Sequence, residues 1–187
     1  LILVPTRELA LQVGEALKHI SVNIRLTVLC GGVDKAKQLE ELELQPQLIV
    51  ATPGRLLDFL RQQLITLESV KQLVLDEADR LMEMGFWPDI ERIIECIPAK
   101  RQTLLFSATL APELKDKALK LLHAPKKLAA QAVNSVTSDI KELLFLVNKG
   151  DKARALIALN QMHQWSQVLA FVNARDDADK LAKRLVK

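Results

Sequence analysis

Three carboxylate side chains follow directly on an apolar segment in the middle of the sequence. Residues 70–75 have the pattern of a buried strand, and Asp76, Glu77 and Asp79 come immediately after it. Because an ionised carboxylate buried without a partner is strongly destabilising, we expect these side chains at the carboxyl end of the strand, facing a crevice. Carboxylates in such a place suit a Mg²⁺ ion and a water molecule to be activated. Taken alone, the acids also fit a solvated loop or the acidic first turn of a helix.

Other apolar segments of the sequence also end in polar residues. Patterns of strands occupy residues 1–4, 24–30, 48–51 and 103–106, and helical patterns lie between them. This alternation predicts an α/β fold with a mostly parallel sheet flanked by helices. Since ligands bind at the carboxyl ends of the strands in open sheets of this kind, the polar residues after these segments should share one functional edge.

Two of the polar segments have the pattern of helix starts that can bind an anion. Thr6 and Thr52 fit the position before a helix, and Pro53 fits the first helical position. Arg7 and Arg55 would then lie in first turns, beside backbone N–H groups that have no partner within the helix. Considered alone, Arg55 could also be one more surface cation.

A glycine pair, Gly31-Gly32, ends the segment 24–30. Glycine permits a positive φ or the close approach of another backbone. The pair alone would also fit an ordinary turn.

The composition is that of a globular protein. The chain has 187 residues, of which 49% are hydrophobic and 26% charged, enough for one core or for one domain and part of another. No apolar run reaches the roughly 18 residues of a membrane span, so we expect no membrane partner and a cytoplasmic location. Cys30 and Cys96 lack metal-ligand spacing and are expected to pack as small apolar residues, Cys96 on the same stripe as Ile90 and Ile93.

The charge distribution separates two parts of the chain. Residues 1–119 hold 14 basic and 17 acidic side chains, whereas residues 120–187 hold 12 and 6. Residues 124–138 lose all periodicity, which predicts a linker between a first domain, 1–123, and the beginning of a second, 139–187. In the second domain we expect strands at 140–147 and 168–172 and helices at 153–162 and from 174 onward.

With these polar segments aligned, the chain closely resembles the DEAD-box RNA helicases of superfamily 2. The family's motifs Ia, GG, Ib, II and III correspond in order to Pro5-Thr6-Arg7-Glu8-Leu9-Ala10, Gly31-Gly32, Thr52-Pro53-Gly54-Arg55, Asp76-Glu77-Ala78-Asp79 and Ser107-Ala108-Thr109. The match around motif II extends from Leu75 to Phe86. The resemblance implies the latter part of one RecA-like domain and the start of a second RecA-like domain.

The resemblance implies catalytic roles for Asp76, Glu77, Asp79, Ser107 and Thr109. Asp76 would hold Mg²⁺ through water on the phosphates of ATP, with Glu77 beside the metal to orient or deprotonate the attacking water. Such phosphoryl transfer depends on positioning and charge neutralisation. Asp79 is expected to bond the hydroxyls of Ser107 and Thr109 and so link the nucleotide site to strand separation.

The same resemblance implies RNA binding through sugar and phosphate contacts, without sequence preference. The residues concerned are Pro5, Thr6, Arg7, Gly31, Gly32, Thr52, Pro53, Gly54, Arg55, Asn173 and Arg175. The last two belong to a segment similar to motif IV, in which Ala174 stands where many relatives carry a hydroxyl. As a plain strand-to-helix corner, this segment is equally well explained.

The implied function is that of an ATP-dependent RNA helicase that opens short duplexes or remodels RNA–protein complexes, with ATP and Mg²⁺ as cofactors, and we expect a monomer. The sequence contains no GxxxxGK[ST] loop, and both ends look cut, so we expect this fragment alone to be inactive. An alternative is a non-catalytic RNA-binding or scaffold relative, against which the intact acids argue. A metal-dependent nuclease would need further ligands that the sequence does not offer.

Overall fold

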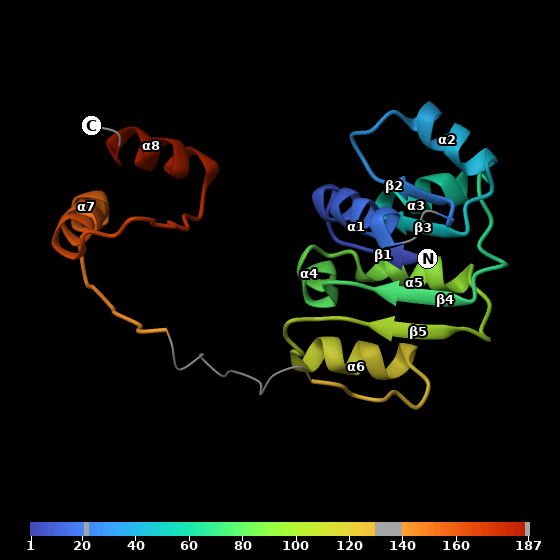
Figure 1. Cartoon of the computed structure of the whole chain (residues 1–187). Helices are drawn as coiled ribbons and strands as arrows, with labels where there is room; N and C mark the ends of the chain where they lie inside the picture. Colours follow the sequence, from blue (N-terminus) through green and yellow to red (C-terminus); the bar gives the residue numbers. More distant parts are fainter. Residues whose placement is uncertain (21–22, 130–139, 186–187) are drawn as a thin grey trace. The chain divides into compact units, whose positions relative to one another are not determined.

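The computed structural model describes residues 1–20, 23–129 and 140–185 (Figure 1). The chain divides into two compact units, Leu1–Leu128 and Ala129–Lys187. Most of the predicted linker, 124–138, lies outside the described residues. The domain boundaries at 123 and 139 therefore stay predictions.

The first unit contains a five-stranded sheet in which every pairing is parallel. Its strands are β1 (Ile2–Leu3), β2 (Leu26–Leu29), β3 (Leu48–Ala51), β4 (Gln72–Leu75) and β5 (Gln102–Leu105), in the order β2-β3-β1-β4-β5. The last residues of the strands are in register across the sheet: Leu29 with Ala51, Ala51 with Leu3, Leu3 with Leu75, and Leu75 with Leu105. The polar segments that follow the strands therefore start from one row, which confirms the predicted shared edge.

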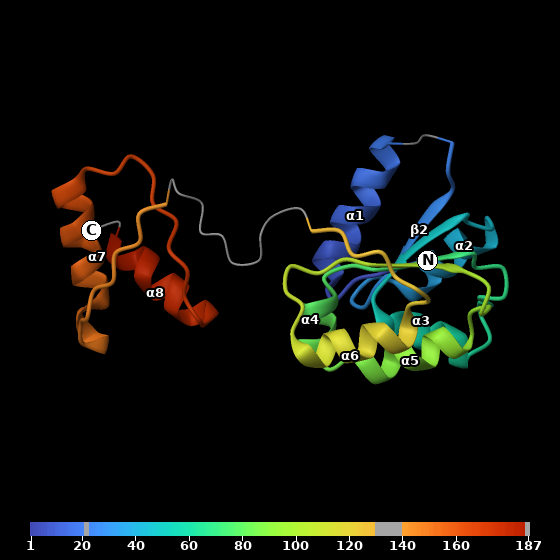
Figure 2. The ribbon, with the colours of Figure 1, turned by 90° about the horizontal axis from the view of Figure 1, so that it is seen from below.

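Helices connect these strands and cover both faces of the sheet. They are α1 (Arg7–Ile20), α2 (Lys35–Glu43), α3 (Pro53–Arg61), α4 (Ala78–Glu83), α5 (Trp87–Glu95) and α6 (Pro112–Leu121). Figure 2 shows α1 on one side of the sheet and α3 to α6 on the other. The short helix α4 agrees with the alternative in which the acids belong to the first turn of a helix, since Glu77 precedes it and Asp79 lies in its first turn. No helix within the described ranges has the length and apolarity that a membrane crossing requires.

Two hydrophobic clusters stabilise these layers. The larger cluster includes Leu3 and Leu75 and the apolar faces of α3 and α5, and the smaller one, under α1, includes Val4 and Cys30. Cys30 is buried as expected, but the prediction for Cys96 was wrong, because this cysteine is exposed. Helix α5 ends at Glu95, just before Cys96, and the following residue, Ile97, is buried instead.

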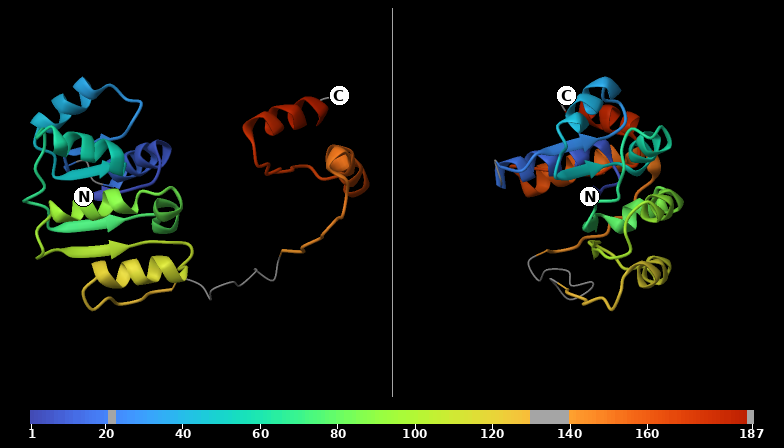
Figure 3. Two further views of the ribbon diagram at one scale, coloured as in Figure 1. Left: turned by 180° about the vertical axis from the view of Figure 1, so that it is seen from behind. Right: turned by 90° about the vertical axis from the view of Figure 1, so that its right-hand side faces the viewer.

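The second unit contains a 3₁₀ turn, Lys149–Asp151, and helices α7 (Lys152–His163) and α8 (Arg175–Leu185), which contact each other (Figure 3). The two helices were predicted. The strands predicted at 140–147 and 168–172 were wrong, since neither segment pairs with a strand within the described residues and Leu144, Leu146 and Phe171 are highly exposed. A strand forms only where a neighbour takes its backbone hydrogen bonds. The second RecA-like domain stays a prediction.

Candidate functional site

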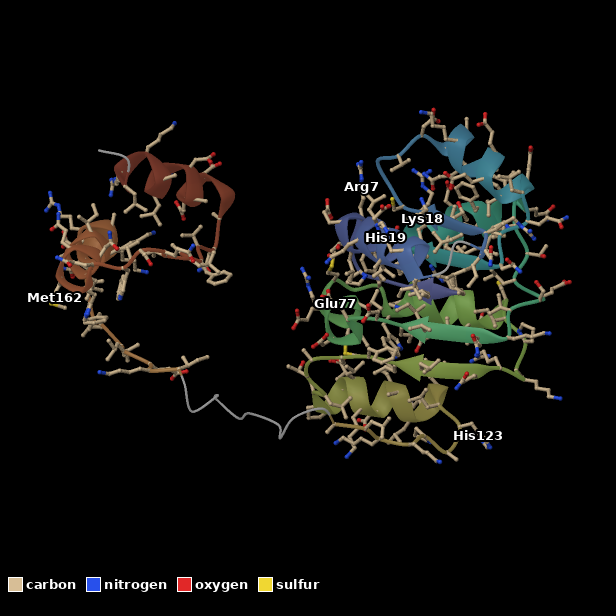
Figure 4. All side chains as sticks on the ribbon, in the orientation of Figure 1. Arg7, Lys18, His19, Glu77, His123 and Met162 are labelled. Carbon is tan, nitrogen blue, oxygen red and sulfur yellow. The ribbon has the colours of Figure 1, made fainter. Side chains whose placement is uncertain are left out.

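The acidic segment begins where β4 ends, next to the central strand β1. The N–H of Asp76 continues the sheet pairing and donates to Leu3 O at 3.0 Å. Its carboxylate Oδ1 accepts the N–H of Glu77 at 2.9 Å. Glu77 has φ 48° and ψ 52°, a left-handed conformation that is uncommon outside glycine and that clusters at functional sites. This bend turns the chain from β4 into α4 at the edge toward which the strands run, where Figure 4 shows Glu77.

The Glu77 side chain is paired with a cation on the next turn. Arg80 Nη1 lies 2.9 Å from Glu77 Oε2. Both side chains are more than a third exposed, so the pair contributes about 0–1 kcal/mol to stability. The contact therefore orients Glu77 more than it stabilises the fold.

Asp79 connects the end of β4 to the segment after β5. Its Oδ2 accepts the Thr109 hydroxyl at 2.8 Å and the Thr109 N–H at 2.9 Å. The Ser107 hydroxyl differs from the expectation: it accepts the backbone N–H of Asp79 at 3.2 Å and donates its one hydrogen to Thr109 O at 2.6 Å. The link between the two segments is present, with Thr109 on the carboxylate and Ser107 on the backbone.

These hydrogen bonds determine the ionisation of Asp79. Burial disfavours the charged form, but bonds from the Thr109 hydroxyl and N–H and from the Arg80 N–H outweigh it and hold the pKa of Asp79 below its usual range. The side chain is therefore an anion at neutral pH, and it acts as an acceptor for the segment after β5.

A loop of residues 30–34, which we call the glycine loop, follows β2. Arg7 Nη1 donates to Gly32 O at 3.0 Å across 25 positions of sequence. Gly32 has φ +71°, and a Cβ atom there would lie 2.6 Å from Arg7 Nη1, so this position requires glycine. At Gly31 a Cβ would meet nothing within 4 Å. One glycine of the pair therefore permits the close approach of Arg7, and the other leaves the loop surface open.

Gln38 of α2 also holds this loop, and sequence analysis missed it. It is 2% exposed. Its Oε1 accepts the N–H of Cys30, and its Nε2 donates to Cys30 O and Val33 O, each at 3.2 Å. The available signal was spacing: Gln38 precedes the partly buried Leu42 by four residues, which places both on one helix face.

The Arg55 side chain contacts the glycine loop and the Phe59 ring, and its contact with RNA stays a prediction. Its Nη2 donates to Val33 O at 3.4 Å, and its guanidinium carbon lies 5.9 Å from the centre of the Phe59 ring. Its Nη1 is buried and has no hydrogen-bond partner among the described residues. Lys35 also lies over Phe59, at 5.3 Å, and pairs with Asp58 at 3.0 Å. The buried aromatic ring attracts the cation, so Arg55 supports the glycine loop from beneath.

The remaining predicted RNA residues of the first unit lie at the starts of α1 and α3. The Thr6 hydroxyl accepts a backbone N–H of the first turn of α1 at 3.2 Å, which confirms the predicted cap. Thr52 precedes α3, but its side chain makes no such bond. Pro5 and Pro53 are buried, and Gly54 is exposed. Thr6 and Thr52 are partly exposed, and the contact of Gly54, Thr6 and Thr52 with RNA stays a prediction.

Two predicted residues belong to the second unit. Asn173 is exposed, and Arg175 begins α8, although its side chain lies outside the described residues. Their part in an RNA site stays a prediction.

The acidic segment can be tested for its fit to Mg²⁺. No group of three or more His, Cys, Asp or Glu side chains that could hold a metal ion occurs in the described part of the chain. However, Mg²⁺ is commonly held by one or two carboxylates together with water and substrate phosphates. Asp76 uses Oδ1 for the Glu77 N–H and keeps Oδ2 for such a contact. Asp76 therefore fits the expected ion, whereas Glu77 is paired with Arg80 through Oε2.

Comparison with known families decides the assignment. The model of the DEAD/DEAH box helicase family matches residues 1–117. The chain belongs to the DEAD/DEAH box helicase family. The residues Asp76 to Asp79 spell the motif for which this family is named.

Several curated relatives match nearly the whole chain. The ATP-dependent RNA helicase RhlB of Pseudomonas syringae is 36% identical over all of this chain and 48% of its own length. The ATP-dependent RNA helicase CshA of Listeria monocytogenes is 36% identical over 99% of this chain and 36% of its own. The RNA helicase CrhR of Synechocystis is 38% identical over 99% of this chain and 38% of its own length. The chain thus spans half or less of the length of these relatives.

A solved structure confirms the fold. The crystal structure of a hypothetical ATP-dependent RNA helicase from Sulfolobus tokodaii superposes with a TM-score of 0.63 at 33% identity, covering 67% of this chain and 38% of that one. Together with the parallel five-stranded sheet, this likeness identifies the first unit as a RecA-like DEAD-box domain.

Proposed function

We propose that the full-length protein is an ATP-dependent RNA helicase, which couples ATP binding and hydrolysis to the local opening of RNA duplexes or the remodelling of RNA–protein complexes. The observation that supports this most directly is the row of strand ends. It brings the acidic segment after β4 and the glycine loop after β2 to one edge of one sheet. Ligands bind at this edge in open α/β sheets.

The acidic side of this edge has the groups that ATP hydrolysis needs. Asp76 would hold Mg²⁺ through water, and the ion would neutralise charge on the phosphates of ATP. Glu77, oriented by Arg80, would position the attacking water and accept its proton. Asp79 transmits any movement of this segment to Thr109 through two hydrogen bonds.

The glycine side would bind the RNA backbone. Helix N-termini, exposed backbone N–H groups and Arg side chains bind phosphates without reading bases. Arg7 and the N-terminus of α1 meet this requirement, as do the exposed residues Gly31 and Gly32. Asn173 and Arg175 of the second unit stay predicted RNA contacts. Cytoplasmic location and a monomeric state stay predictions.

The test is RNA-stimulated ATP hydrolysis by the full-length protein and its Glu77→Gln variant. The exchange keeps the size of the side chain but removes the base, so we expect turnover to fall by about 10³-fold while RNA and ATP still bind. Glu83→Gln, at an exposed residue of the helix α4 that follows Glu77, is the matched control. Turnover that survives Glu77→Gln would refute the assigned role of Glu77. A wild-type protein that binds RNA but never hydrolyses ATP would favour the non-catalytic relative.

The isolated chain provides a second comparison. Because it lacks the phosphate-binding loop motif, we expect no measurable hydrolysis by residues 1–187 under conditions in which the full-length protein turns over.

A further inference from the structure

Side chains from α1, α2 and α3 occupy the carbonyl oxygens of the glycine loop. Arg7 donates to Gly32 O, Gln38 to Cys30 O and Val33 O, and Arg55 to Val33 O. Within the described part of the chain, the N–H groups of Gly31 and Gly32 have no protein acceptor. The carbonyl oxygens of Cys30, Gly32 and Val33 therefore accept from protein side chains, and the N–H groups of the exposed residues Gly31 and Gly32 are left for a ligand.

Gln38 differs from the two arginines in burial and in the number of bonds it makes. Arg7 is exposed and Arg55 is partly exposed, whereas Gln38 is 2% exposed. Its amide bonds both the N–H and the C=O of Cys30, the first residue of the loop, and also reaches Val33 on the far side of the glycine pair. A buried amide that loses these partners leaves unsatisfied polar groups. Gln38 therefore ties the two ends of the glycine pair together from the protein interior.

We propose that Gln38 is a positioning residue for RNA binding, which fixes the glycine loop in the shape that presents the Gly31 and Gly32 N–H groups to a phosphate. Gln38 does not touch the RNA. Its effect is to remove in advance the entropy that a loose loop would lose on binding. This inference rests on the proposed function, because it takes the glycine loop to be an RNA contact.

The test measures the dissociation constant of the full-length protein for a fluorescently labelled single-stranded oligouridylate, beside ATP turnover and thermal unfolding. Gln38→Met keeps the length of the side chain and removes its hydrogen bonds. We expect RNA affinity to fall on the order of tenfold, whereas kcat at saturating RNA and KM for ATP change by less than about twofold because the acidic segment is untouched.

The matched control is Thr27→Val. Thr27 of β2 is 1% exposed and donates to Glu41 of α2, so its replacement removes a buried bond to the same helix without touching the glycine loop. We expect it to lower the unfolding temperature as Gln38→Met does, with RNA affinity unchanged. If Gln38→Met gives no cooperative unfolding transition, the RNA affinity of Gln38→Glu is measured in its place. That variant keeps the acceptor for the Cys30 N–H and loses the Nε2 donors.

The possible outcomes distinguish the positioning role of Gln38 from the proposed helicase function. A folded Gln38 variant that binds RNA as tightly as wild type would overturn the positioning role and leave the helicase assignment intact. So would a Thr27→Val protein with an equal loss of RNA affinity. A wild-type protein with no RNA binding would instead overturn the proposed function, and the positioning role with it.

Discussion

The two halves of the sheet edge present opposite hydrogen-bonding groups. After β4 and β5, carboxylate and hydroxyl oxygens predominate, and Asp79 is an acceptor held in place by Thr109. After β1 and β2, side-chain donors cover the carbonyls of the glycine loop and leave backbone N–H groups exposed. The halves meet between β1 and β4, which are neighbours in the sheet. The same strand geometry thus presents mainly acceptors on one side, where we propose the cation, and donors on the other, where we propose the RNA phosphates.

The largest expected effect comes from the acidic half. Asp76→Asn keeps an acceptor for the Glu77 N–H and removes the charge that would hold Mg²⁺. We expect ATP hydrolysis by the full-length protein to fall by about 10³-fold or more, since charge neutralisation dominates phosphoryl transfer. RNA affinity measured by fluorescence anisotropy should change little. Asp89→Asn, on the surface helix α5, is the control. An equal loss of RNA affinity would show that the halves do not act separately.

The next effect comes from the glycine half. Gly32→Ala places a Cβ 2.6 Å from Arg7 Nη1 at a φ of +71°, so the loop or Arg7 must move. We expect RNA affinity to fall on the order of tenfold, with ATP turnover at saturating RNA retained. Gly31→Ala should have a smaller effect, because its Cβ meets nothing within 4 Å. Equal losses for the two substitutions would contradict the assigned role of the Arg7 contact.

Two arginines in the glycine half should differ from each other. Arg7 is exposed and can reach a phosphate, whereas the Arg55 guanidinium lies over Phe59 with Nη1 buried. Arg7→Met should lower the slope of log affinity against log salt by about 0.7 for single-stranded RNA. Arg55→Met should weaken binding a few-fold and leave that slope as it is, because a supporting residue releases no counterions. A reduced slope for Arg55→Met would show that Arg55 itself contacts an RNA phosphate.

The smallest expected effect is a pH dependence of stability. The pKa of Asp79 is lowered in the folded protein, against about 3.9 in an unfolded chain. Its ionised form therefore stabilises the fold above that unfolded value, and this contribution is lost as the pH falls through the folded pKa. Asp79→Asn should be less stable than wild type at pH 7, and the difference should shrink toward pH 3. Urea unfolding followed by circular dichroism at the two pH values would measure it. A difference that stays constant would exclude this ionisation as its source.

Local patterns predicted much of the first unit. The strand 48–51 begins and ends where the sequence indicates, because apolar residues buried on both faces are continuous there. Thr6 caps α1 as predicted, since the cap involves residues three apart. The acids after β4 lie at the sheet edge because their charge keeps them out of the core.

Other features depend on residues far apart in the chain. The sequence does not specify the order β2-β3-β1-β4-β5, which makes β1 central and divides the edge into its two halves. The inward turn of Arg55 and the burial of Gln38 depend on the packing of α2 and α3 against the glycine loop. The strands expected in the second unit failed for the same reason, since strand pairing requires a partner that no local pattern supplies.

The sequence by itself therefore determined which residues could do chemistry and at which end of each strand they lie, because capping, period and charge act over a few residues. Tertiary structure decided which of them meet and which face inward. Hydrogen bonds such as Arg7 to Gly32 and Thr109 to Asp79 join positions 25 and 30 residues apart. Such bonds depend on how the strands are ordered, and that order is set by the packing of the whole core.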